Sequence, residues 1–260
     1  MTVRGLFKKV LRPFRPGIEA ARRSVLGLPP VGQVDFGDLR RLAPISRKFG
    51  VDRGLPIDRF YVERFLDSHG DDIRGHVLEI GEDTYTRRFG GPRVMANDVL
   101  HVSADNPAAT IVADLADAPQ IPDDRFDAII LTQTLQLIFD PPAAIRTLHR
   151  ILKSGGTLLV TVPGISPVAT DSVWGPTWHW SFTENSIRRL IGARFEPAHC
   201  RFETQGNVLA AVAFLEGLAA EDLRQEELTT ADRDYPVIIT AWARKSGIGT
   251  SAEAGLPWVR

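Results

Sequence analysis

The sequence predicts an α/β fold, in which a largely parallel β-sheet is flanked by helices on both faces. From about residue 72 onward, short β-branched or apolar runs alternate with segments of helical period, which is typical of parallel sheets with crossover helices. The 260 residues are 43% hydrophobic and 24% charged, as in ordinary globular chains. There is a single cysteine, Cys200, so neither an intrachain disulfide nor a cysteine-based zinc site is expected.

Seven segments are candidate strands, because each is short, apolar and rich in β-branched residues. In chain order they are 76–80, 93–97, 109–114, 126–132, 157–162, 199–204 and 236–243. The last segment follows a stretch over 207–228 that looks helical, and then a charged loop. We therefore expect the last strand to enter the sheet antiparallel to its neighbours.

Two further helices are predicted next to these strands. The first, over 56–70, repeats apolar residues at helical spacing and ends at a glycine. The second begins at the Pro141–Pro142 pair and ends at the Gly155–Gly156 pair, since proline favours the first turn of a helix and glycine its end. This second helix connects the fourth strand to the fifth.

Charge is unevenly distributed along the chain. Residues 1–60 hold 13 Lys and Arg against 5 Asp and Glu, whereas the remainder is acidic. We expect a basic extension over 1–55, a central domain over 56–245 and a tail over 246–260. Basic and apolar residues interleave within 1–25, which indicates either a solvated tail or weak contact with anionic lipid or an acidic partner. Neither an export signal nor a membrane span is recognisable, so we expect a cytoplasmic protein.

Ligands of parallel sheets bind at the carboxyl ends of the strands. Glu79 and Gly81 end the first predicted strand, and Asp98 closes the second, where a carboxylate could accept hydrogen bonds from ribose hydroxyls. This pattern fits either a dinucleotide or an adenosyl cofactor. A dinucleotide motif starting at Gly81 would need glycines where Asp83 and Thr86 stand, so that motif is absent.

The same loop is acidic, with Glu79, Glu82 and Asp83 close together. Carboxylates repel the phosphates of a dinucleotide. They tolerate a ligand that carries local positive charge, such as an amino group or a sulfonium.

The stretch 74–163 resembles a class I S-adenosylmethionine-dependent methyltransferase of the small-molecule, type 11-like group, and the match continues more loosely to residue 245. The motifs that carry the resemblance are EIGEDTY (79–85), FDAIILTQTLQLI (126–138), LHRILKSGGTLLVTVPG (148–164) and WHWSFTENSIRRLI (178–191). The motifs DRGxPIDRxY (52–61) and YTRRFGG (85–91) also resemble those of a bacterial methyltransferase-like subgroup associated with glycan gene clusters.

The resemblance implies a Rossmann-like seven-stranded sheet of order 3-2-1-4-5-7-6 and S-adenosylmethionine as the cofactor. In the family's first motif, Asp83 and Tyr85 stand where further glycines are usual. Glu79 would orient this loop, Gly81 would admit the methionine part of the cofactor, and Asp98 would bind its ribose. The complete set of implied cofactor contacts is Glu79, Gly81, Tyr85, Asp98, Asp114, Leu115 and Gln133.

For the methyl acceptor, the resemblance implies a pocket near the aromatic segment, with contacts from Gln136, Trp178, Trp180 and Tyr61. His179 is the candidate general base, because its ordinary pKa suits proton removal near neutrality; a hydrogen-bonded structural histidine is the alternative. We expect O-methyl transfer to a small-molecule or sugar hydroxyl, with neither a metal nor a nucleic acid involved. The alternative is a methyltransferase-like module that binds without turnover.

Overall fold

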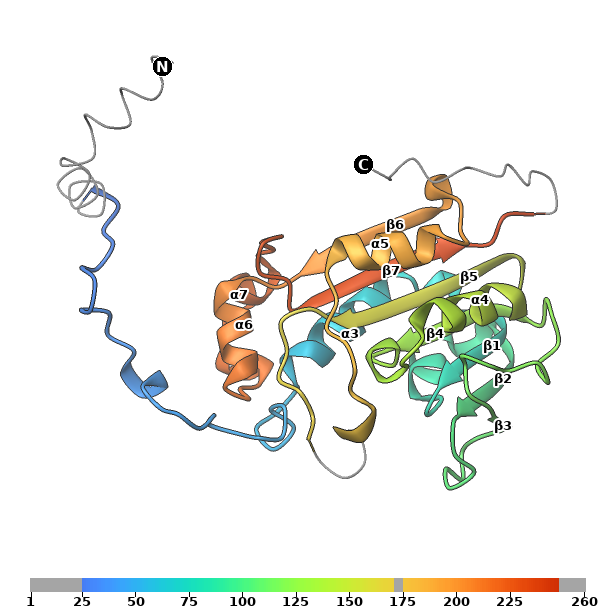
Figure 1. Cartoon of the computed structure of the whole chain (residues 1–260), viewed down its shortest axis with the longest axis horizontal. Coiled ribbons are helices and arrows are strands. Elements are labelled where there is room, and N and C mark those ends of the chain that lie inside the picture. Colours follow the sequence, from blue (N-terminus) through green and yellow to red (C-terminus); the bar gives the residue numbers. More distant parts are fainter. Residues whose placement is uncertain (1–24, 171–174, 248–260) are drawn as a thin grey trace, which may run out of the picture. The chain divides into compact units, whose positions relative to one another are not determined.

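The computed structural model describes residues 25–170 and 175–247, and the contacts divide the chain into two units (Figure 1). The first unit extends to Ala43, and the second begins at Pro44. Residues 44–55, which the sequence assigned to the extension, therefore group with the domain that follows. Two predicted features lie mostly outside the described residues. Of the segment 1–25, predicted to contact lipid or a partner, only Val25 is described, and of the predicted tail only residues 246 and 247.

Within the first unit, the described residues form one short 3-10 helix, η1 (Gly37–Leu39). The Asp35 carboxylate accepts a hydrogen bond from the Gly37 amide at 2.9 Å, and the Arg40 guanidinium lies 5.3 Å from the ring centre of Phe36.

In the second unit, the described residues form a seven-stranded sheet of order β3-β2-β1-β4-β5-β7-β6 (Figure 1). Neighbouring strands from β3 to β5 are parallel, whereas β7 is antiparallel to both β5 and β6. The predicted fold class, strand order and antiparallel last strand are confirmed. The strands are β1 (Gly75–Ile80), β2 (Val94–His101), β3 (Ile111–Val112), β4 (Phe126–Thr132), β5 (Leu152–Pro163), β6 (Cys200–Gln205) and β7 (Ile238–Arg244).

Helices cover both faces of this sheet. One face packs against α4 (Pro141–Ile151) and α5 (Glu184–Gly192), and the other packs against α3 (Ile57–Ser68) and the π-helical turn η3 (Thr86–Gly90). Local sequence explains where these helices begin. The Asp140 carboxylate accepts from the Ala143 amide at the start of α4, and α5 begins with a capping box.

A third apolar cluster lies beside the amino-terminal end of α3, where Ile57 and Tyr61 pack with α6 (Val208–Leu215). The stretch predicted as one long helix over 207–228 is broken, because α6 ends before Gly217, which has a φ of +69°. A 3-10 turn, η8 (Ala220–Asp222), and a short helix, α7 (Gln225–Thr229), follow it.

Three predicted boundaries are wrong. Strand β2 continues to His101, because Leu100 pairs with the end of β1 and His101 pairs with Val112 of β3; the edge strand β3 is only two residues long. Helix α4 ends at Ile151, and the Gly155–Gly156 pair lies inside β5 instead of ending the helix. Leu152 already pairs with Phe126, and the register then shifts across the glycines. No helix of the described residues is long and apolar enough to cross a membrane.

Candidate functional site

The carboxylate of Glu79 organises the loop that leaves β1. This side chain is buried, and its oxygens accept hydrogen bonds from the backbone amides of Tyr85 at 3.2 Å and Thr86 at 2.7 Å. Burial raises the pKa of Glu79 to about 7, against the opposing effect of these hydrogen bonds. The contact is the loop-orienting one that the sequence predicted for this residue.

Gly81 presents bare backbone at the end of β1. Its φ is +89°, and a Cβ placed on it would meet no atom within 4 Å. The Gly81 amide donates to the Leu100 carbonyl at 2.9 Å, and its carbonyl accepts from the side-chain amide of Asn106 at 2.6 Å. Strand β2 and the loop that follows it therefore hold the backbone of Gly81 beside open space, which a ligand can enter. Asn106 was missed because nothing in the local pattern marks it.

The two residues that replace glycines in this loop are held by other protein groups. The Asp83 carboxylate accepts from Arg87 at 2.7 Å and from Asn97 at 3.0 Å. The half-buried ring of Tyr85 lies 5.9 Å from that of Phe89, and burial raises the pKa of the Tyr85 phenol to about 12. The departure from the glycine pattern is thus accommodated outside the space next to Gly81.

The sequence predicted that Asp98 closes the second strand, but it does not lie at a strand end. It stands three residues before the end of β2 and is largely buried. One carboxylate oxygen accepts from Thr110 at 2.6 Å, and the other accepts from Arg125 at 2.6 Å and from His76 at 2.8 Å. These contacts hold its pKa below the ordinary value, although burial alone would raise it. Asp98 is therefore an ion-pair partner of Arg125 inside the domain, and its contact with a ribose stays a prediction.

The loop after β3 keeps the predicted acidic residue at the surface. Asp114 is exposed, and one of its carboxylate oxygens accepts from the Ala116 amide at 2.8 Å. The side chain of Leu115 is buried in the core below the loop. Asp114 can still receive a donor from a ligand, whereas Leu115 has only backbone groups available for one.

Gln133 and Gln136 lie together after β4. The backbone of Gln133 has a φ of +46°, which is strained for a residue other than glycine. Its backbone amide donates to the Thr161 carbonyl of β5 at 2.9 Å. Gln136 is buried and donates through Nε2 to the Gln133 carbonyl at 2.8 Å. Its Oε1 has no hydrogen-bond partner among the described residues. A buried acceptor without a partner is costly, and such atoms concentrate where ligands bind.

The aromatic segment is joined to this loop, because the Gln136 carbonyl accepts from the amides of both His179 and Trp180. Trp178 is partly buried, its ring stacks on Phe49 at 6.4 Å, and its Nε1 is buried without a partner in the described part of the chain. His179 and Trp180 are exposed, and the His179 ring meets Phe139 edge-on at 5.3 Å. The predicted acceptor residues Gln136, Trp178 and Trp180 are thus brought together with His179.

Tyr61 is not part of this group. Its ring is buried in the core, and its hydroxyl donates to the Leu228 carbonyl at 2.9 Å. Its contact with the methyl acceptor stays a prediction. Sequence reasoning instead missed Asp58, in the first turn of α3, where burial raises the carboxyl pKa to about 6. Besides burial, its charge contributes to the raised pKa of the Tyr85 phenol. Among the described residues, no cluster of side chains has the composition of a metal site.

Comparison with known proteins identifies the family of the chain. Residues 53–204 match a family model described as a methyltransferase domain. Ubiquinone/menaquinone biosynthesis C-methyltransferases of Shewanella sp. and Shewanella baltica are 35% identical over 89 residues, which is 34% of this chain. The aligned part covers 30% of the length of these curated relatives.

Solved structures with a similar fold include an S-adenosylmethionine-dependent methyltransferase from Archaeoglobus fulgidus. It is 12% identical with a TM-score of 0.49, over 72% of this chain and 94% of that one. The YcgJ protein of Bacillus subtilis is 14% identical with a TM-score of 0.45, over 72% of this chain and 99% of that one.

Proposed function

Since the chain belongs to the methyltransferase domain family, as its match over residues 53–204 shows, we propose that it transfers a methyl group from S-adenosylmethionine to a small-molecule hydroxyl. The observation that carries this proposal is the backbone at Gly81, which is held at a φ of +89° beside open space. Apart from its two chain neighbours, no described residue has an atom within 4 Å of the position that a Cβ of Gly81 would take.

The residues around Gly81 fit the cofactor of this family. S-adenosylmethionine supplies a methyl group on a positively charged sulfonium, which the acidic loop tolerates. Glu79 keeps the loop in place through the amides of Tyr85 and Thr86, and Gly81 admits the methionine part. We assign Asp114, which is exposed, to the adenine amino group and Gln133 to the sulfur end of the cofactor, as the resemblance to the family implies.

The acceptor side supports a hydroxyl. Gln136 Oε1 can only accept a hydrogen bond and Trp178 Nε1 can only donate one, and both are buried without partners among the residues described. A small molecule with several hydroxyls, such as a sugar, can meet both needs through separate groups and leave the reacting hydroxyl free to donate to a base, because each hydroxyl donates one hydrogen bond and accepts others. Transfer from a sulfonium is an in-line displacement, so alignment in a dry pocket supplies most of the catalysis. His179 is the proposed base that removes the hydroxyl proton.

Calorimetry tests the cofactor assignment. S-adenosylhomocysteine should bind with a one-to-one stoichiometry, whereas NAD should give no heat of binding. A protein that binds neither would contradict the cofactor assignment and favour a binding module without turnover.

Activity is tested with radiolabelled S-adenosylmethionine and a panel of sugars and other hydroxyl compounds. The expected product is a methyl ether that forms only with the intact protein. Gln136→Ala should raise the KM of the acceptor and leave S-adenosylhomocysteine affinity unchanged. Label that appears on a carbon atom of the product would refute the hydroxyl assignment while leaving the methyltransferase activity in place.

A further inference from the structure

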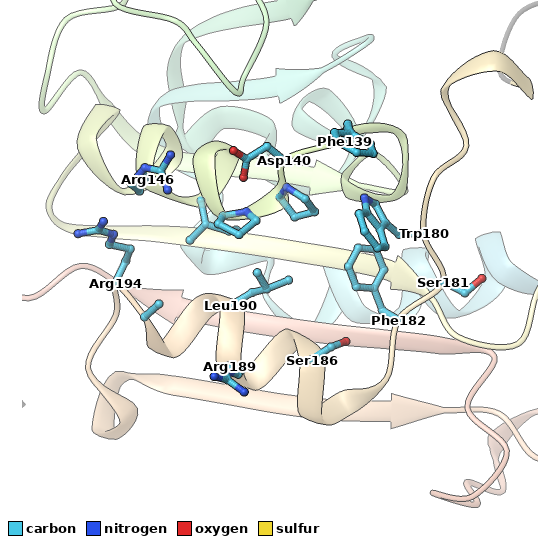
Figure 2. A pocket seen from close by; sticks show the side chains of 14 residues that line it. Phe139, Asp140, Arg146, Trp180, Ser181, Phe182, Ser186, Arg189, Leu190 and Arg194 are labelled. Carbon is cyan, nitrogen blue, oxygen red and sulfur yellow. The ribbon is translucent and has the colours of Figure 1, made fainter. Parts of the chain in front are cut away.

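A groove of about 690 Å³ lies between α4 and α5, on the face of the sheet that these helices cover (Figure 2). Ile145 of α4 and Leu190 of α5 contribute to its apolar lining. Phe139 and Trp180 lie at one end, and Arg146 and Arg194 lie at the other (Figure 2). The groove shares Trp180 with the aromatic segment, and Phe139 also meets the His179 ring. The remainder of its lining, between α4 and α5, has no part in the proposed methyl transfer.

One side of α5 forms a wall of the groove. Ser186, Arg189 and Leu190 recur at intervals of three and four residues on this side of the helix, and Ala193 and Arg194 continue the lining beyond the helix end at Gly192. The opposite side of α5 buries Ile187 and Ile191 against the sheet. At the end of the groove, Phe139 is 74% exposed and Trp180 is 40% exposed. Large aromatic side chains left exposed beside an apolar hollow are a typical feature of interaction sites.

Three arginines line this groove, and all of them are exposed: Arg146, Arg189 and Arg194. None of the three forms an ion pair or a side-chain hydrogen bond with another described residue. Other arginines of the same two helices are paired, because Arg150 binds Asp123 and Arg188 binds Glu184. The lining also includes the carboxylate of Asp140, which caps α4. The free positive charge of this region is therefore concentrated around the groove.

We propose that the groove docks an amphipathic helical segment of a partner protein, with carboxylates beside an apolar stripe. Guanidinium groups pair with carboxylates in a planar, two-pronged geometry, so Arg189 and Arg194 favour acidic side chains over other polar groups. An apolar stripe would fill the hollow between Ile145 and Leu190, as ridges of one helix fill grooves between others. A flat anionic membrane would meet the arginines at the rim without reaching this recessed lining.

A synthetic peptide tests the proposal. The probe is a fluorescein-labelled helix of about 15 residues, the length at which isolated helices become stable enough to populate, with leucines on one face and glutamates beside them. Fluorescence anisotropy should show saturable one-to-one binding. A peptide of the same composition in scrambled order is the control for charge alone.

Two protein variants test the charged part and the apolar part of the groove. The double variant Arg189→Glu/Arg194→Glu should weaken binding of the probe at least about tenfold, since like charges then face each other. Ala193→Trp should have a similar effect by filling the groove without a change of charge. Arg64→Glu, at an exposed position of α3 on the other face of the sheet, is the matched control and should leave binding unchanged. All variants should keep their thermal stability and their affinity for S-adenosylhomocysteine.

The proposal is overturned if the ordered and scrambled peptides bind equally, or if the groove variants bind the probe as the unmodified protein does. It is also overturned if the unmodified protein binds vesicles of phosphatidylglycerol through Arg189 and Arg194 but not the peptide. That last result would identify a lipid surface as the occupant. None of these outcomes depends on methyl transfer, so they are distinguishable from a failure of the proposed function.

Discussion

Replacement of Glu79 by glutamine is expected to change how the stability of the protein depends on pH. Burial raises the pKa of this carboxyl from its ordinary value of 4.5 to about 7. Between about pH 4.5 and pH 7, the carboxyl group therefore keeps its proton in the folded protein but has lost it in the unfolded chain. The stability that this proton brings is complete below about pH 4.5 and is lost as the pH rises through about 7. At about 1.4 kcal/mol per pKa unit, the difference corresponds to about 3 kcal/mol of the free energy of unfolding.

The glutamine variant cannot titrate at this position. Its free energy of unfolding, relative to that of the unmodified protein, should therefore rise by up to about 3 kcal/mol between about pH 5 and about pH 8. Urea denaturation at several pH values measures this difference, because all other groups titrate in both proteins. Glu82→Gln, at an exposed position of the same loop, is the control for the loss of a loop carboxyl with Glu79 in place. A Glu79→Gln variant whose relative stability falls as the pH rises would show that the amide hydrogen bonds outweigh burial, and would refute the reasoning.

Three further substitutions separate structural from functional roles. Asp98→Asn should lower the free energy of unfolding by about 1–3 kcal/mol, because it weakens the hydrogen bonds with Arg125 and the other partners of this carboxylate. The affinity for S-adenosylhomocysteine, measured by calorimetry, should stay unchanged. A tenfold loss of affinity would return this residue to the cofactor site. Gly81→Ala places a methyl group in the open space at a φ of +89°, so S-adenosylhomocysteine should bind at least about tenfold more weakly in the same assay, and equal affinity would contradict the proposed cofactor position. His179→Ala should lower kcat about 100-fold with cofactor affinity retained, and an unchanged kcat would show that alignment alone suffices.

Local patterns explain how much of the fold was predictable. The strands are visible as short apolar runs, and α4 is visible from Pro141 and the apolar period that follows it. The strand order came from the resemblance to known methyltransferases, and the sheet confirms it. Glu79 could be recognised because an acidic residue within an apolar strand conflicts with its surroundings, and such conflicts mark functional positions. The strand ends were less predictable, because β2 and β5 extend as far as their neighbours can pair with them.

Sequence by itself determined the fold class, the order of the elements and the loop in which Glu79 and Gly81 lie, because these depend on local propensity and period. The tertiary structure decided which polar side chains are available to a ligand. Asp98 is occupied by Arg125, which is 27 positions away, and the hydroxyl of Tyr61 is occupied by a carbonyl 167 positions away. A hydrogen-bonding group becomes a ligand contact only if distant parts of the chain leave it unsatisfied, and no local spacing encodes that condition.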